Sequence, residues 1–485
     1  MTHPFARISL TLLVGWAHRH RRLSAVVLLG PLGFGCDKPS AHESAPVAPS
    51  SSARAPLAKS AAPQKLELSC REEKQGARFL VGEVGKARPK AQPRGDDEDD
   101  EDVIDLPFSV EAGGAVPTSD GFALAALEHR KAVAVTVARD AASGSRLELA
   151  DVHGDVEPPR LASEGDRVVA AVVGNDAGSS TLTLMAFQPS AGAASLKRGA
   201  QVSRSREAGA AFDLVLAPTR GLMVWDQWDA AKSHGTIEAL GFDPVTAQGQ
   251  AEPRVLSAPD DDAESPRVMR RGGGFWVSWV SHGPPAKTAR RAPRPALDRG
   301  DAGTEGEYDS VVEVTPRRLK LVPLDERGVA TAEPTLVTAP DAHVLAYDAV
   351  PFGEGVLFAW RDDPTTLGAE APKIHLARVA PDGTVALEVI DDEEVAEGAP
   401  RLFTDRDGTA QPRTWLALMG KRGRSRLGYI GPSGKLAGPL QDIAGFGLNE
   451  PLALESRRFL LAQPRGQALD LSVVRCALGR AKPQK

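Results

Sequence analysis

The chain has 485 residues, a formal net charge of −6, 42% hydrophobic residues, 38 prolines and 47 glycines. This charge gives no reason to expect a general affinity for nucleic acid, and the apolar fraction suffices for a buried core. After the N-terminus, apolar runs of helical period are missing, whereas short runs rich in Val, Leu and Ala alternate with turn residues. The sequence therefore predicts a mostly β chain.

Residues 1–36 have the pattern of an export signal. Basic residues between positions 18 and 22 precede the apolar run Leu23–Leu32, which is followed by Gly33-Phe34-Gly35-Cys36. Such a core is typical of a secretory signal and too short to span a bilayer. Its end resembles a bacterial lipobox, in which the cysteine is lipidated, although Gly33 stands where that motif prefers an aliphatic residue. A plain signal peptide cut nearby and a retained anchor helix are the alternatives.

Residues 37–63 are dominated by Ser, Ala and Pro. A segment with almost no large apolar residue cannot bury a core, so we expect a disordered tether. Together with a lipidated Cys36, it predicts an exported protein in the periplasm or at the cell surface. Its contact with the membrane would be through the lipid anchor only.

A repeat occupies residues 64–479. In Pro266–Val280 a short strand, a glycine turn and an apolar strand follow one another, and an alternating strand comes later as the third of the unit. In the first unit this third strand is predicted at Arg146–Asp151. Diverged copies open at residues 116, 159, 212, 266, 347, 400 and 451. A period of about fifty residues, with three visible strands and room for a fourth, is typical of a β-propeller blade. We predict seven blades, with six or eight as alternatives, and an insertion in the fourth at residues 283–310.

The seventh unit ends soon after its third strand, with a tail at 480–485. The N-terminal segments Lys65–Cys70 and Phe79–Val84 are strand patterns outside any unit. We therefore predict that the N-terminal strand completes the last blade and closes the ring. If Cys36 carries lipid, Cys70 and Cys476 are left to form a disulfide in an oxidising compartment. Two unpaired buried thiols are the alternative.

Two further features have both a structural and a functional interpretation. The acidic loop 86–103 contains the run Asp96–Asp102, which we interpret as solvated because a calcium site needs oxygens spaced around a turn. The tryptophans of the apolar strands are expected to pack between blades. Carbohydrate stacking is the alternative for any that reach a rim, with Trp228 as the best candidate.

Catalytic patterns are largely missing from the sequence. It contains no H-E-x-x-H, paired C-x-x-C, G-x-S-x-G or phosphate-binding glycine loop. We therefore assign no catalytic residue, metal ligand or cofactor.

One set of charges merits attention. The position after the opening residue of units two to six is occupied by residues of alternating sign, namely Arg160, Asp213, Arg267, Asp348 and Arg401. Ion pairs between blades are one interpretation, and exposed pairs contribute about 0–1 kcal/mol each. The other is a ligand site in which Arg160, Arg267 and Arg401 hold an anion. Sialidases use an arginine trio on a propeller in this way, but their S-x-D-x-G-x-x-W box is missing here.

In outline, residues 64–479 with the leader resemble bacterial cell-envelope lipoproteins that carry a propeller domain. Our leading hypothesis is a membrane-tethered, non-enzymatic scaffold that binds an envelope protein or a glycan through a propeller face. The basic insertion Pro284–Arg299 would be its contact element, or else a loop without a partner. An exported hydrolase or lyase acting on a glycan or another anionic ligand is the alternative. Architecture alone does not decide between them.

Overall fold

The computed structural model describes residues 66–80, 110–128, 131–139, 144–152, 157–176, 179–204, 211–283, 315–362, 373–390, 399–405, 413–419, 425–443, 452–453, 458–465 and 468–480. All of them lie in a compact unit that comprises Ala62–Lys485. The predicted signal peptide with Cys36, the tether, the acidic loop 86–103 and nearly all of the insertion 283–310 lie outside the described residues.

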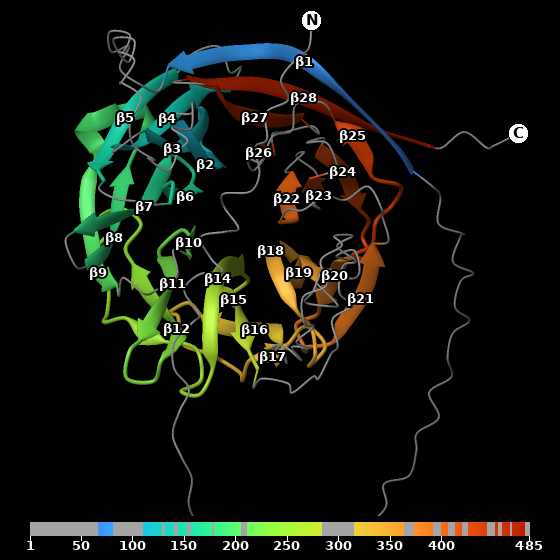
Figure 1. Cartoon of the computed structure of the whole chain (residues 1–485). Coiled ribbons are helices and arrows are strands. Elements are labelled where there is room, and N and C mark those ends of the chain that lie inside the picture. Colours follow the sequence, from blue (N-terminus) through green and yellow to red (C-terminus); the bar gives the residue numbers. More distant parts are fainter. Residues whose placement is uncertain are drawn as a thin grey trace, which may run out of the picture. The chain divides into compact units, whose positions relative to one another are not determined.

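The described chain forms seven four-stranded antiparallel sheets (Figure 1). Each sheet is one blade, and the first three follow one another in sequence. Blade 1 is β2 (Val110–Pro117), β3 (Gly121–Glu128), β4 (Lys131–Ala138) and β5 (Gly144–Asp151). Blade 2 is β6 (Arg160–Glu164), β7 (Arg167–Asp176), β8 (Ser179–Phe187) and β9 (Lys197–Arg204), with the 3-10 helix η1 (Pro189–Ser195) before β9. Blade 3 is β10 (Phe212–Leu216), β11 (Gly221–Asp229), β12 (His234–Phe242) and β13 (Arg254–Val255).

The remaining blades repeat the same meander until the last one. Blade 4 is β14 (Asp262–Arg271), β15 (Gly274–His282), β16 (Arg317–Asp325) and β17 (Thr335–Leu336). Blade 5 is β18 (Val344–Phe352), β19 (Gly355–Asp362), β20 (Lys373–Val379) and β21 (Val385–Ile390). Blade 6 is β22 (Arg401–Asp405), β23 (Arg413–Met419), β24 (Ser425–Ile430) and β25 (Gln441–Ile443). Blade 7 is β26 (Leu452–Ala453), β27 (Arg458–Arg465), β28 (Ala468–Arg480) and β1 (Leu66–Leu80).

The first strand of each blade faces the centre of a closed ring (Figure 1). Strand β2 contacts β6, and the contacts continue through β10, β14, β18 and β22 to β26, which contacts β2 again. The predicted seven-bladed propeller is therefore confirmed.

Strand β1 closes the ring at the outer edge of blade 7. It lies antiparallel to β28, with Leu66 opposite Arg480 and Cys70 opposite Cys476. The two cysteines form a disulfide. The N-terminal strand thus joins the last blade, as predicted, but as one strand of 15 residues with two register shifts rather than as two short segments.

The prediction for blade 1 was wrong in one respect. Residues 146–151 were expected to form its third strand, but they belong to β5, the fourth and outermost strand, and β4 is the third. Only His129 and Arg130 separate β3 from β4. Because only two residues lie between them, β3 and β4 form what looks like a single apolar run in the sequence.

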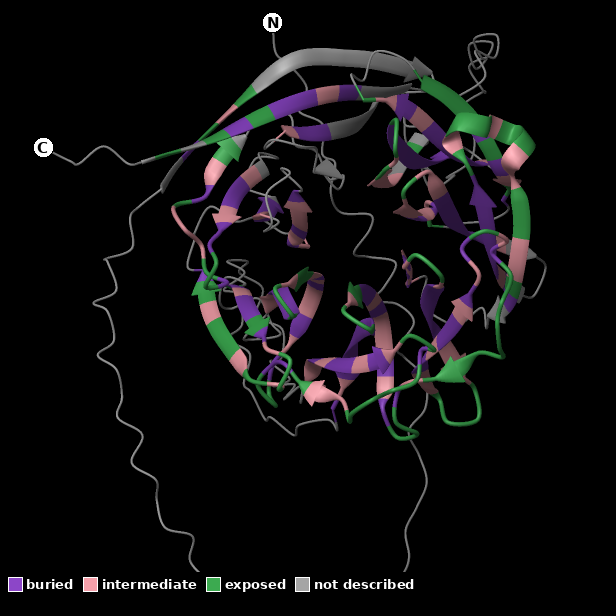
Figure 2. Cartoon of the chain, turned by 180° about the vertical axis from the view of Figure 1, so that it is seen from behind, coloured by how far each residue is buried: buried purple, intermediate pink, exposed green. Residues whose placement is uncertain are grey.

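The core lies between blades rather than within each one. One cluster joins Trp415 of blade 6 to Phe459 of blade 7 and Leu68 of β1. Another joins Leu460 and Val473 of blade 7 to blade 1, so the apolar packing also continues across the point of closure. In Figure 2 the exposed residues lie on the outermost strands and in the connecting loops.

The tryptophans of the second strands pack in these clusters, as predicted. Trp225, Trp279 and Trp415 are fully buried, and Trp276 and Trp360 nearly so. The indole N–H groups of Trp279 and Trp415 donate to Asp261 and Asp405, each at 3.0 Å. Trp228, at the end of β11, is partly exposed, so it stays the candidate for carbohydrate stacking.

Within the described part of the chain, no helix combines the length and the apolar character needed to cross a membrane.

The Cys70–Cys476 disulfide should stabilise the closed ring. The cysteines are 406 residues apart, and joining them limits the unfolded chain. We expect the Cys70→Ser/Cys476→Ser variant of residues 62–485 to lose about 3–5 kcal/mol of unfolding free energy. Its urea unfolding midpoint should match that of the reduced wild-type protein. Equal unfolding midpoints for the variant and the oxidised wild type would show that the disulfide adds no stability to the closed ring beyond that of strand pairing.

Candidate functional site

Strand register places the five predicted charges at one level of the ring. Each lies on the innermost strand of its blade, opposite a small or β-branched residue of the second strand. The pairs are Arg160 with Ala171, Asp213 with Val224, Arg267 with Ser278, Asp348 with Ala359, and Arg401 with Ala417. We call these five residues the charged arc.

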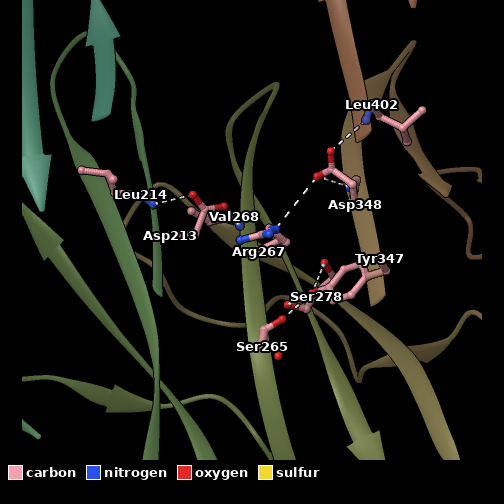
Figure 3. A network of polar contacts seen from close by, with 10 residues as sticks. Asp213, Leu214, Ser265, Arg267, Val268, Ser278, Tyr347, Asp348 and Leu402 are labelled. Carbon is pink, nitrogen blue, oxygen red and sulfur yellow. Dashed lines mark hydrogen bonds and ion pairs between the residues drawn. The ribbon is translucent and has the colours of Figure 1, made fainter. Parts of the chain in front are cut away.

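The two aspartates of the charged arc bind backbone N–H groups in the same way (Figure 3). In Asp213, Oδ1 accepts a hydrogen bond from the N–H of Leu214, and Oδ2 accepts one from Val268 of the next blade, both at 2.9 Å. In Asp348, Oδ1 accepts from Ala349 at 2.9 Å, and Oδ2 accepts from Leu402 of the next blade at 2.8 Å. Each carboxylate therefore joins the inner strand of its own blade to the inner strand of the following blade.

The arginines lie between these carboxylates. Nε of Arg267 is 3.9 Å from Oδ1 of Asp348, so the structure contains an ion pair between blades 4 and 5. Burial raises the pKa of Asp213, while the charges of Arg267 and Arg160 act in the opposite direction. Arg401 directly precedes Leu402, whose N–H binds Asp348. The three predicted arginines thus alternate with two aspartates that hold neighbouring blades together.

Blade 1 has no charge at the corresponding level. Its inner strand contains a bulge between Ala112 and Ala115. A Cβ on Gly113, within this bulge, would lie 2.7 Å from the carbonyl oxygen of Pro159, at the entry to blade 2. Backbone packing therefore occupies this position in blade 1, and the charged arc is confined to blades 2 to 6.

Sequence reasoning missed Tyr347, which lies beside Asp348. Its buried hydroxyl donates to the carbonyl oxygen of Ser265 at 2.8 Å and lies 3.1 Å from that of Ser278, both in blade 4 (Figure 3). Ser265 has a left-handed backbone, with φ of 54°, and lies in a bulge of β14. Burial raises the pKa of the Tyr347 phenol. The need of a buried tyrosine for a partner could be anticipated from the sequence, but the bulge that supplies the carbonyl could not.

A second polar cluster holds the two ends of the insertion in blade 4. Oε1 of Glu264 lies 3.0 Å from Nε2 of His282 and accepts a hydrogen bond from Arg317. The N–H of Gly283 also donates to the carbonyl oxygen of Pro316 at 2.8 Å. We call Glu264, His282 and Arg317 the neck cluster, because His282 and Arg317 are the last residue of β15 and the first of β16.

At the neck cluster, the pKa of Glu264 is set by its charged and hydrogen-bonded partners more than by its burial. Burial alone would raise the pKa of Glu264, but the hydrogen bond from His282 and the charge of Arg317 outweigh it, and the pKa is lowered. Glu264 is therefore ionised at neutral pH and binds the residues that flank the insertion.

The described residues contain no group of three or more His, Cys, Asp or Glu side chains placed to hold a metal ion. Asp213, Asp348, Arg267 and Tyr347 contact neighbouring blades through their polar groups. These contacts link blade 3 to blade 4 and blade 5 to blades 4 and 6.

No protein-family model matches the chain, and a search of curated proteins found no match. Solved structures similar to it include an acylaminoacyl peptidase from Pyrococcus horikoshii, at 14% identity and a TM-score of 0.39, covering 75% of this chain and 51% of that one. A prolyl endopeptidase matches at 11% identity and 0.40, covering 83% and 51%. The β-propeller domain of the Trilobed protease from Pyrococcus furiosus matches at 11% and 0.41, covering 77% and 95%. The chain thus spans about half the length of the first two, and its fold is established here from its own strand pairing.

Replacing an aspartate of the arc should weaken the ring. In Asp348→Asn one carboxylate oxygen becomes an amide donor, so one of the two backbone N–H groups loses its acceptor. We expect a loss of about 1–3 kcal/mol of unfolding free energy, measured by urea denaturation. Glu354→Gln removes the same charge at an exposed position of the same blade, and its unfolding free energy should stay within about 0.5 kcal/mol of the wild-type value. If the two variants are equally stable, the link between blades contributes nothing.

The neck cluster should make the free energy of unfolding depend on pH. Because the pKa of Glu264 is lowered in the folded state, its contribution is present above its unfolded value of about 4.5 and is lost as the pH falls through the folded value. Urea unfolding at pH 7 and at pH 3 should show a smaller pH-dependent loss for Glu264→Gln than for the wild type. The exposed change Glu252→Gln should leave the wild-type difference intact. Equal differences in all three proteins would contradict the prediction.

Proposed function

We propose that this protein is an exported, lipid-anchored scaffold of a bacterial cell envelope, which binds an anionic protein or glycan through one face of its propeller without catalysis. The observation that carries the proposal is that residues of the charged arc bind neighbouring blades. Asp213 and Asp348 bind the backbone of neighbouring blades, and Arg267 pairs with Asp348. These contacts are suited to fixing the geometry of a ring, so partner binding is assigned to a loop face instead.

The insertion in blade 4 is the proposed contact element. Pro284–Arg299 contains five basic residues and a single acidic one, which favours an anionic partner. The neck cluster and the Gly283–Pro316 hydrogen bond support this assignment, because they attach both ends of the insertion to the sheet of blade 4. A partner bound to the insertion would therefore be attached to the rigid ring.

In this proposal the export leader and Cys36 determine where the protein is located. A lipid on Cys36 and the tether 37–63 would keep the propeller near the membrane while its face reaches a partner in the envelope.

The proposal is tested by capture of partners from envelope extract with residues 62–485. We expect a specific partner to bind the wild type and to be lost when four basic residues of the insertion are replaced by Glu: Lys287, Arg290, Arg291 and Arg294. A matched control reverses four exposed basic residues outside the insertion: Lys197, Arg198, Arg254 and Arg327. It should retain the partner. Absence of any specific partner for the wild type would count against a scaffold.

The alternative is an exported hydrolase or lyase that acts on an anionic ligand at the channel. It is favoured by one feature, the position of Arg160, Arg267 and Arg401 at one level of the ring. Turnover of an anionic glycan by purified residues 62–485, abolished in a folded Arg401→Gln variant, would replace the scaffold with this enzyme.

A further inference from the structure

Strand β21 forms an outer edge of the propeller that exposes large apolar side chains. Strand β21 is the outermost strand of blade 5, and all six of its residues pair with β20 on one side. On its other side, no strand pairs with it within the described residues. Such an edge presents backbone N–H and C=O groups that can pair with another strand.

Apolar side chains accompany this edge. Leu387 and Val389 are 55% and 47% exposed, although both are large and hydrophobic. They alternate with Glu388, so they project from the same face of the sheet, as does Val385. Val385 packs against the core between blades 4 and 5. The corresponding outer strand of blade 4, β17, has only two residues, which is consistent with the exposure of the rest of this face.

The outer strands of other blades are protected from pairing in the ways that natural proteins use. Strands β13, β17 and β25 are two or three residues long. Strand β5 is long but carries Arg146 and Glu148, and β9 begins with Lys197 and Arg198. The sequence of β1, the outer strand of blade 7, contains an unbroken charged run from Arg71 to Lys74. Short length and charge both discourage pairing at an edge. Strand β21 has neither protection on the face that bears Leu387 and Val389.

The sequence of β21 is complementary to itself. In an antiparallel pair with a second copy, centred on Leu387, each Leu387 lies opposite the other and each Val385 lies opposite Val389. Ala386 then lies opposite Glu388, so the two carboxylates are not directly opposed. A shift of one residue would place Glu388 opposite Leu387 or Val385, and moving the two-fold axis to Glu388 would place the two carboxylates opposite each other. Only the register centred on Leu387 places Val385, Leu387 and Val389 each opposite another residue of this apolar set.

From this complementarity we propose that β21 is a homodimer interface. Two copies of the chain pair their β21 strands about a two-fold axis at Leu387, forming one continuous eight-stranded sheet from two blades. The interface is isologous, because the same residues contribute from both copies. It lies on the outer rim and is independent of the proposed function of the insertion.

Self-association of residues 62–485 tests the proposal by sedimentation velocity over a range of concentrations. We expect the wild type to form a dimer. Leu387→Lys should weaken the dimer at least about tenfold, because the two lysines would face one another across the axis. Val389→Lys, a second variant at an exposed position, should do the same. Val255→Lys on β13, where the valine is 58% exposed, should leave the dimer unchanged.

A cysteine at the axis tests the register itself. Leu387→Cys should form a covalent dimer on mild oxidation, whereas Val255→Cys should not. A wild type that stays monomeric at about 100 μM, a concentration at which even weak specific pairs associate, would overturn the proposal. A dimer that persists in the Leu387→Lys variant would also overturn it. So would a monomeric wild type that binds a different protein which the Leu387→Lys variant no longer binds, since β21 would then pair with a foreign strand.

Discussion

The pairing of β1 with β28 is the interaction on which the rest of the molecule depends. A meander of seven sheets has two free ends, and each inner strand contacts the inner strand of the next blade. The contact between β26 and β2 forms only if blade 7 is held in place beside blade 1. Strand β1 brings residues from the beginning of the chain to the edge of the last blade, and the Cys70–Cys476 disulfide makes this junction covalent. The ring is thus closed by strand pairing as well as by packing.

Closure also explains the placement of the core. Because each apolar cluster is shared by neighbouring blades, no blade has a complete core of its own. Fully buried tryptophans fill these shared layers, and polar links cross them near the channel. Asp213 and Asp348 each satisfy a backbone N–H of the next blade, and Tyr347 satisfies a carbonyl of the preceding one. Buried polar groups need such partners, so these residues fix the spacing between blades as they satisfy one another.

The sequence was sufficient for the parts of the fold that repeat. Seven copies of an apolar strand, together with a last unit that lacks its fourth strand, predict the ring and its closure. The third strand of blade 1 was misassigned because its hairpin has only two intervening residues, which leave no turn signal. The charged arc could be found from its alternation, but its bonds to backbone N–H groups depend on register and on the contact between blades. The bulge at Ser265, which supplies a partner for Tyr347, has no signature in the local pattern.

These contacts separate the parts of the molecule that hold the ring from the parts that are available to a partner. A group that bridges two blades cannot turn toward a ligand without leaving a buried N–H or carbonyl unpaired, which costs about 1–3 kcal/mol for each group. Asp213, Asp348 and Tyr347 carry this constraint, whereas the exposed side chains of Leu387 and Val389 on β21 do not. Exposed apolar residues on β21 are likewise outside every contact that closes the ring. Variation in the loops and at the rim can therefore change what the protein binds while the propeller is preserved.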